Sequence, residues 1–153
     1  MARPLYETKD HLAAELDAMQ RFADRYDYRF EKLPLQYRLD FAVFSNLSNR
    51  VRGLVEVRCR NISWEKYDTL IMSLKKIMHM RDYSKMGISS LILLENTNGL
   101  WMWKYDRDDV SDIRWGGRFK GGPSKPRDDQ DSEPVVHIHK SKFTPVDPLA
   151  VPK

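Results

Sequence analysis

The sequence predicts an α/β domain in which a mixed β-sheet is flanked by helices. Two helical stretches and several segments with alternating apolar residues follow the order α-β-β-α-β-β, before a Gly- and Pro-rich loop and a last strand. A length of 153 residues fits one domain and can bury a hydrophobic core without disulfides. We expect one domain over residues 1–143 and a Pro-rich tail over residues 144–153.

Composition excludes several classes of protein. With 41% hydrophobic and 31% charged residues the chain is not disordered as a whole, and the apolar run at residues 91–94 is far shorter than the roughly 20 residues of a membrane span. The first residues lack the apolar stretch of a signal peptide, so we expect a cytoplasmic protein. The lone cysteine, Cys59, excludes an intramolecular disulfide. A net charge of +4 permits a phosphate-bearing partner without requiring one.

The first half of the chain predicts a helix and two strands. Residues 8–27 carry an apolar stripe at helical spacing, formed by Leu12, Leu16, Met19, Ala23 and Tyr26. After Pro34 the period changes to two over residues 35–44, which favours a strand. The polar residues 45–52 are then expected to form a turn, and residues 53–59 a second strand.

The second half predicts a helix, three strands and a basic loop. Residues 63–83 fit a helix with Ser63 as its N-cap and a stripe of Tyr67, Leu70, Ile71, Leu74, Ile77 and Met78. Strands are expected at residues 88–95, 100–105 and 135–139. The segment Asn96-Thr97-Asn98-Gly99 favours a hairpin between the first two, because Asn-Gly tolerates positive φ. Residues 114–133 are rich in Gly, Pro and charge, so we expect a mobile basic loop there.

Asp40 and Glu56 are the first candidate site residues. If residues 45–52 form the turn of a hairpin, the two residues are equally far from its midpoint and face each other across the strands. Like charges in that position destabilise the pair. A divalent cation removes this repulsion, because Mg²⁺ is typically held by one or two carboxylates together with water and substrate phosphates. In the alternative interpretation the register differs by a residue or two and both acids are solvated.

Glu15 and Arg58 are the other two candidates. Glu15 lies within the apolar stripe of the first helix, where a carboxylate is costly unless it is paired, hydrogen-bonded or bound to metal; alternatively, it reaches solvent or an arginine at the edge of the stripe. Arg58 shares a strand face with Glu56, where a cation can stabilise charge developing on a phosphate. Alternatively, Arg58 is an ordinary surface residue.

The order and spacing of these candidate residues resemble those of a known protein family. Asp40, then Glu56-Val57-Arg58 on the next strand, then a helix and further strands, resemble the PD-(D/E)XK nuclease superfamily, whose restriction-endonuclease-like core follows the order α-β-β-β-α-β. Residues 54–61, 113–118 and 133–138 are similar to those of small phage-encoded members. The resemblance covers residues 12–143, and its third early strand would lie in residues 30–34.

The resemblance implies a role for each candidate. Asp40 and Glu56 match the two metal-binding acids, Glu15 matches the helical acid that completes the metal shell, and Arg58 stands where the family has its catalytic lysine. The implied reaction is hydrolysis of DNA phosphodiester bonds with Mg²⁺ or Mn²⁺, in the host cytoplasm if the protein is phage-encoded. Arginine stays protonated and suits phosphate binding better than lysine chemistry. Three alternatives follow: slow cleavage, a lysine borrowed from the second helix (Lys66, Lys75 or Lys76), or loss of catalysis.

DNA contacts are expected from the start of the second helix and from the basic loop. The residues are Lys66, Tyr67, Lys75, Arg114, Arg118 and Lys120. Two other functions remain open: a non-catalytic nucleic-acid-binding or virion assembly protein on the same scaffold, and a homo-oligomeric interaction module with structural acids. Trp101 and Trp103 share a strand face, as do His137 and His139; we expect a buried aromatic face from the first pair and a half-exposed surface from the second.

Overall fold

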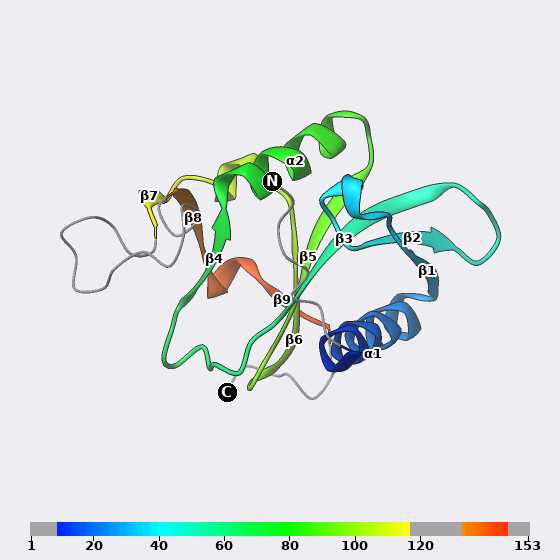
Figure 1. Cartoon of the computed structure of the whole chain (residues 1–153), viewed down its shortest axis with the longest axis horizontal. Helices are drawn as coiled ribbons and strands as arrows, with labels where there is room; N and C mark the ends of the chain where they lie inside the picture. Colours follow the sequence, from blue (N-terminus) through cyan, green and yellow to red (C-terminus); the bar gives the residue numbers. More distant parts are fainter. Residues whose placement is uncertain (1–8, 117–132, 147–153) are drawn as a thin grey trace.

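Two β-sheets and two helices form the protein in the computed structural model, which describes residues 9–116 and 133–146 (Figure 1). Six strands form one mixed sheet in the order β1-β2-β3-β5-β6-β9, and three form a second sheet in the order β4-β8-β7. The elements are α1 Lys9–Tyr26, β1 Tyr28–Lys32, β2 Phe41–Ser45, β3 Val51–Cys59, β4 Thr69–Ser73, α2 Leu74–Lys85, β5 Ser89–Asn96, β6 Gly99–Lys104, β7 Ile113–Trp115, β8 Pro134–His139 and β9 Thr144–Pro145.

The core elements confirm the expected fold class. Within the first sheet and its helices, the chain runs α1-β1-β2-β3-α2-β5, which is the α-β-β-β-α-β order of a restriction-endonuclease-like core, with β4 inserted before α2. The strand expected within residues 30–34 is β1, and it pairs antiparallel with β2. Strands β3 and β5 are parallel, so the long connection between them crosses over the sheet and carries α2.

The prediction of a strand over residues 35–40 was wrong. Leu35–Tyr37 is a 3₁₀ turn that begins after Pro34. Arg38 then adopts the left-handed conformation, with φ of 65°, which ends the turn and redirects the chain into β2 at Phe41. The alternation of Leu35, Tyr37 and Leu39 therefore mimics a strand, although the first two residues lie in a turn.

The hairpin of β2 and β3 has the expected register. Phe41 pairs with Val55, and Ala42 pairs with Leu54. The same register, continued by one residue, brings Asp40 opposite Glu56. A bulge between Val43 and Phe44 shifts the pairing only on the turn side of the hairpin. The register therefore holds at the end of the hairpin where the two acids lie.

The predicted helix over residues 63–83 was wrong in its first half. Thr69–Ser73 is strand β4, which pairs antiparallel with β8, and the helix begins at Leu74. Leu70 and Met72 are buried while Ile71 between them is 52% exposed, which is the alternation of a strand. Pairing with a strand far along the chain decides this segment, and no local pattern reveals that partner.

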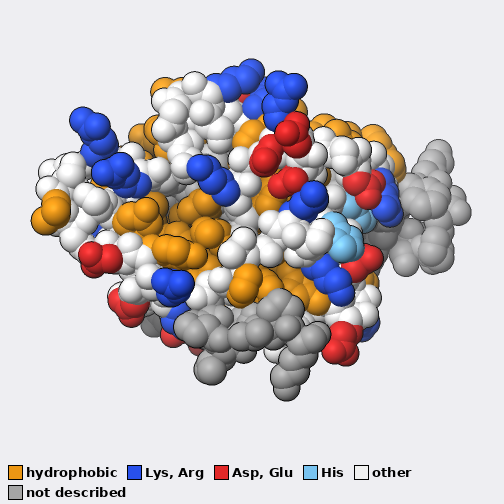
Figure 2. Space-filling model, turned by 180° about the vertical axis from the view of Figure 1, so that it is seen from behind, with side chains coloured by type: hydrophobic (Ala, Val, Ile, Leu, Met, Phe, Trp, Pro, Cys, Tyr) orange, Lys and Arg blue, Asp and Glu red, His pale blue; other side chains and the backbone are white. Residues whose placement is uncertain are grey.

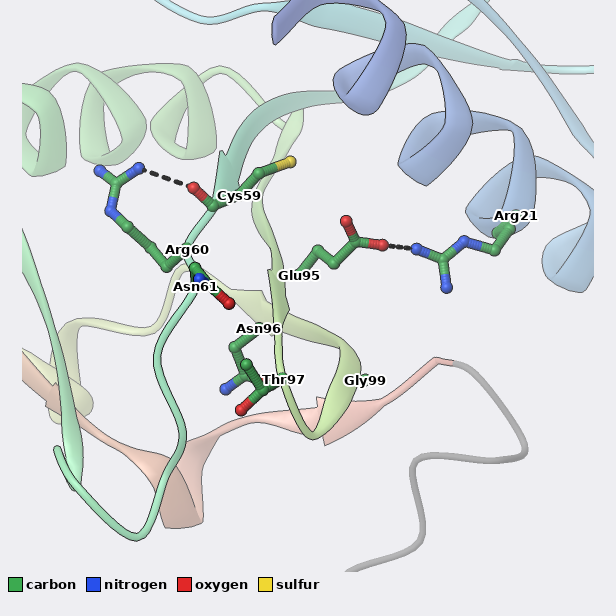
Figure 3. A pocket seen from close by; sticks show the side chains of 8 residues that line it. All are labelled: Arg21, Cys59, Arg60, Asn61, Glu95, Asn96, Thr97 and Gly99. Atoms are coloured by element: carbon green, nitrogen blue, oxygen red, sulfur yellow. Dashed lines mark hydrogen bonds and ion pairs between the residues drawn. The ribbon is translucent and has the colours of Figure 1, made fainter. Parts of the chain in front are cut away.

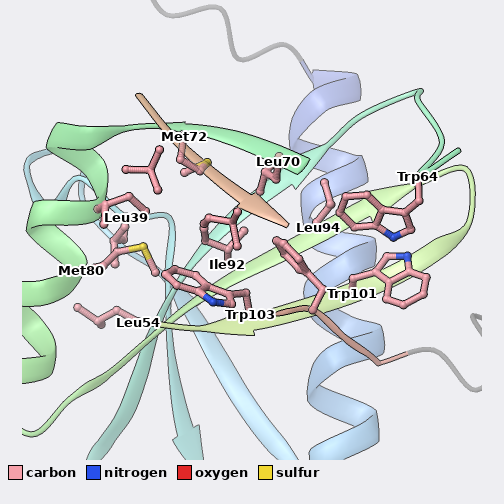
Figure 4. Close-up of a cluster of buried hydrophobic side chains, with 14 of the residues drawn as sticks. Leu39, Leu54, Trp64, Leu70, Met72, Met80, Ile92, Leu94, Trp101 and Trp103 are labelled. Atoms are coloured by element: carbon pink, nitrogen blue, oxygen red, sulfur yellow. The ribbon is translucent and has the colours of Figure 1, made fainter. Parts of the chain in front are cut away.

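Two hydrophobic cores fill the space on the two faces of the six-stranded sheet. On one face α1 packs through Ala18, Met19 and Phe22 against alternate residues of β2, β3 and β5. On the other face α2 and the second sheet cover a larger core (Figure 4). Its labelled members are Leu39, Leu54, Trp64, Leu70, Met72, Met80, Ile92, Leu94, Trp101 and Trp103. Trp101 and Trp103 are thus buried, as expected from their shared strand face.

The C-terminal region follows the prediction in part. The strand expected at residues 135–139 is β8, and the β5–β6 hairpin forms at Asn96–Gly99 as predicted. Residue 114 belongs to β7 rather than to a loop, while residues 117–132 lie outside the described residues. Thr144–Pro145 pairs with β6 and Val146 is buried, so the first residues of the expected Pro-rich tail pack against the domain. In the described parts of the chain, neither helix has the length and hydropathy needed to cross a membrane.

Candidate active site

Asp40 is fixed at the point where β2 begins. Its backbone N–H donates to Val55 O at 2.9 Å, and its carbonyl oxygen accepts from Leu33 N at 2.8 Å. Its side chain also accepts a hydrogen bond, from the backbone N–H of Val57 to Oδ2 at 2.9 Å. These three bonds hold the carboxylate against β3 through Oδ2.

Glu56 lies in the middle of β3 on the face that α2 covers. Val55 and Val57 pack into the core on the α1 side, so the side chain between them points to the other face. It is only 4% exposed. Burial raises the pKa of Glu56 above its ordinary value, Arg58 and Lys76 oppose this rise, and the charge of Asp40 adds to it.

Two cations hold the buried Glu56 carboxylate. Arg58 Nη2 lies 2.7 Å from Glu56 Oε2, and Lys76 Nζ lies 3.3 Å from Glu56 Oε1. Arg58 comes from the same strand face, two residues along, whereas Lys76 comes from the first turn of α2. Lys76 also donates a hydrogen bond to the carbonyl oxygen of Arg38. The ammonium thus joins the acid of β3 to the turn before β2.

Glu15 lies on the α1 side of the sheet and approaches Asp40 through a third cation. Lys32, the last residue of β1, places Nζ 3.9 Å from Glu15 Oε2 and 3.9 Å from Asp40 Oδ1. The same ammonium lies 4.9 Å from the centre of the Phe41 ring. The structure therefore links Glu15 and Asp40 by a shared lysine at the end of β1.

Asp40 and Glu56 together offer hard oxygen donors of the kind that Mg²⁺ prefers. Among the described residues, no group of three or more His, Cys, Asp or Glu side chains is close enough to bind one metal ion. A cation at this site would therefore take its remaining ligands from water and phosphate, which is usual for Mg²⁺. Two carboxylates from neighbouring strands, with Lys76 and Arg58 beside them, fit that donor set.

The residues expected to contact DNA fall into three places. Lys75 is exposed and precedes Lys76 in the first turn of α2. Lys66 and Tyr67 lie in the turn before β4, so the length of that strand separates them from α2. Arg114 lies on β7 and is paired with Asp112 at 2.8 Å. Arg118 and Lys120 lie outside the described residues.

Sequence reasoning missed Lys32 and Arg38 and left Lys76 as one of three choices. Lys32 ends a strand that carries no clear alternation, and Arg38 lies in a segment expected to be extended. Lys76 falls next to Lys75 in a helix whose start was placed too early. The apolar pattern predicted that helix. Only the packing of α2 on the sheet shows that Lys76 is the lysine that contacts Glu56.

None of the candidate acids Glu15, Asp40 and Glu56 lines the hollow shown in Figure 3. It has a volume of about 510 Å³ and is lined by α1, the end of β3 and the β5–β6 hairpin. Arg21 and Glu95 form an ion pair on its wall, and Arg60 donates to the carbonyl oxygen of Cys59. Burial raises the pKa of the Cys59 thiol, so it stays protonated at neutral pH and is a poor nucleophile.

The face seen in Figure 2 carries no continuous basic field among the described residues. Lys and Arg side chains are scattered there between hydrophobic and neutral ones, and His side chains lie beside acidic ones. His137 Nδ1 lies 3.1 Å from Thr69 Oγ1, and His139 Nδ1 lies 2.9 Å from Ser141 Oγ. Both histidines therefore have local hydrogen-bond partners in a partly exposed strand surface, as expected.

The match to a protein family agrees with the sequence pattern. The model of a family described as "Phage putative PDDEXK endonuclease" matches residues 1–146. Among solved structures, the chain is similar to Hjc, a Holliday junction resolvase from Archaeoglobus fulgidus, with 10% identity, 94% of this chain and 100% of that chain covered, and a TM-score of 0.47. The search of curated proteins gives no match.

Proposed function

Because the chain belongs to the family of phage PDDEXK endonucleases, we propose that it hydrolyses phosphodiester bonds of DNA with Mg²⁺ or Mn²⁺ held by Asp40 and Glu56. The observation that supports this proposal is the register of β2 and β3, because its continuation by one residue beyond Phe41 and Val55 brings Asp40 opposite Glu56. Like charges held together in this way favour a bound cation. A phage origin, and hence the host cytoplasm as the place of action, is part of the same proposal.

Asp40 and Glu56 would hold the divalent cation, which would supply polarisation of the scissile phosphate and activation of the attacking water. The chain supplies the rest. The Val57 N–H fixes Asp40, and Arg58 fixes Glu56 Oε2, so both carboxylates keep one orientation without reorganisation when substrate binds. The role in the metal shell that the resemblance implies for Glu15 stays a prediction, and Lys32 would have to leave the two carboxylates for it.

We assign the role of the family lysine to Lys76. Its Nζ already contacts Glu56, and it can donate a hydrogen bond to the scissile phosphate or to the attacking water. Arg58 stays protonated and has a bidentate fork, which suits holding a carboxylate or a phosphate. The two cations thus divide between them what one lysine does in the family pattern.

The test is DNA cleavage by the wild type and by Glu56→Ala in the presence of Mg²⁺ or Mn²⁺, with circular dichroism as the check on folding. We expect cleavage by the wild type that a chelator abolishes, and none by Glu56→Ala. Glu65→Ala is the matched control, because Glu65 is an exposed acid in the turn before β4. Cleavage that survives in Glu56→Ala would overturn the proposal.

One observation favours a second function, a DNA-binding protein without catalysis. Arg58 stands where the family has lysine, and it is engaged with Glu56. On this interpretation the wild type binds DNA with the usual dependence on salt and leaves it intact at every metal concentration. Asp40→Ala would then leave binding unchanged or tighten it, because a negative charge near the phosphates is removed.

A further inference from the structure

The turn that joins β1 to β2 holds a fixed place beside the two acids. It comprises Leu35–Tyr37 and Arg38 and leads through Leu39 to Asp40. Two side chains of α2 hold its backbone: Lys76 donates to the carbonyl oxygen of Arg38, and Tyr83 Oη donates to that of Tyr37 at 2.7 Å. A turn anchored twice to a helix presents its side chains in a constant orientation.

This turn exposes two large apolar side chains. Leu35 is 69% exposed and Tyr37 is 43% exposed. Leu33 and Leu39, on either side of the turn, pack into the core between the sheet and α2. The chain therefore buries the leucines that flank the turn and leaves an aliphatic and an aromatic side chain in water next to the candidate active site.

Cations gather around the same turn. Arg38 lies in the turn, and Lys75 and Lys76 lie on the first turn of α2. These charges act on His79, which lies on the second turn of α2. Burial is the main reason why the pKa of His79 is lowered; the charges of Arg38, Lys76 and Lys75 lower it further, and Asp82 opposes this. A positive field beside exposed apolar side chains is the combination with which proteins bind single-stranded nucleic acid: cations follow the phosphates and aromatic rings stack on bases.

We propose that Leu35 and Tyr37 form a stacking platform for an unpaired nucleotide, so that the substrate is DNA with a single-stranded part next to the cleaved bond. The statement that this DNA is a substrate rests on the proposed function. The binding surface itself does not require catalysis. In a continuous duplex each base is already covered on both faces by its neighbours. An exposed ring on a fixed turn gains a partner only where a base is unpaired.

The experiment measures equilibrium binding in a chelator, without cleavage, of a single strand, a duplex and a duplex with a single-stranded overhang, all of equal length. We expect the single strand and the overhang to bind more tightly than the duplex. Tyr37→Ala should weaken binding of the overhang by about tenfold and leave duplex binding unchanged, and Tyr37→Phe should keep the preference. Leu47→Ala, which truncates a leucine that is 97% exposed in the β2–β3 turn, is the control.

A second measurement separates stacking from charge. Arg38→Ala should reduce the slope of log affinity against log salt by about 0.7 for the single strand, whereas Tyr37→Ala should leave that slope unchanged. Equal binding of duplex and overhang, or a preference that survives in Tyr37→Ala, would overturn the inference. Neither outcome bears on cleavage, and loss of cleavage in Glu56→Ala does not bear on this preference, so the two proposals fail separately.

Discussion

Lys76 Nζ lies 3.3 Å from Glu56 Oε1, so a cation in the first turn of α2 meets a buried acid in the middle of β3. The two residues belong to the crossover unit that joins the parallel strands β3 and β5. The position of the ammonium is therefore set by how α2 packs on the sheet. We propose that the catalytic cation of this site comes from the helix, because Arg58 stands at the strand position where the resemblance implies a lysine.

Lys76→Ala should reduce the rate of DNA cleavage by roughly 10²- to 10³-fold, because it removes a charged donor positioned at the carboxylate. The measurement is the single-turnover rate at saturating Mg²⁺. Lys85→Ala, in the last turn of the same helix, is the matched control and should cleave like the wild type. An unchanged rate for Lys76→Ala would show that this lysine takes no part in the reaction.

Arg58→Lys should change the cleavage rate by less than about tenfold. On our account Arg58 holds Glu56 Oε2 and Lys76 supplies the ammonium, so a lysine at position 58 adds no missing group. The same single-turnover assay measures it, with the free energy of unfolding as a check on the buried acid. A gain of a hundredfold or more contradicts this division of roles and would mean that Arg58 attenuates the native site.

Lys32→Met should tighten the binding of Mn²⁺ by up to about fivefold. Lys32 lies 3.9 Å from both Glu15 Oε2 and Asp40 Oδ1, and a half-exposed ion pair is worth up to about 1 kcal/mol. Removing this ammonium takes away one cation that competes with a metal ion for the Asp40 carboxylate. Electron paramagnetic resonance of free Mn²⁺ gives the affinity directly. Lys104→Met, at the end of β6, serves as control, and equal affinity in Lys32→Met and the wild type contradicts the prediction.

His79 should make the protein less stable as the pH falls below 6.5. Burial, together with Arg38, Lys76 and Lys75, lowers its pKa from that ordinary value, so the unfolded chain takes up a proton that the folded protein resists. The unfolded state thus binds more protons, and stability is lost as the pH falls. Urea denaturation at neutral pH and at about pH 5.5 should show a smaller loss for His79→Gln than for the wild type. Equal losses would mean that His79 titrates normally.

The hairpin of β2 and β3 could be predicted from the sequence because its turn is polar and its strands alternate on both sides. The register of Asp40 and Glu56 followed from counting outward from that turn. Strand β4 could not be predicted in the same way. Leu70 and Met72 fit a helical stripe as well as an alternation, and the choice depends on β8, which is distant in the sequence.

The cations of the site were harder to find than its acids. A carboxylate on an apolar face stands out in a sequence, whereas a lysine at the end of a strand or on a helix looks like any solvated residue. Lys32 and Lys76 reach the acids from β1 and α2, and each does so through packing between elements. Arg38 ends the turn before Asp40 in the left-handed conformation. An arginine does not signal this conformation in a sequence, as glycine or asparagine would.

The most direct test of the account is a titration of Mn²⁺ into the wild type, Asp40→Ala, Glu56→Ala and the double variant. If the two acids hold one cation, each single variant loses most of the Mn²⁺ affinity, and the double variant loses little more than either single variant. Binding that persists in both single variants, or losses that simply add, would show that Asp40 and Glu56 do not share a metal ion.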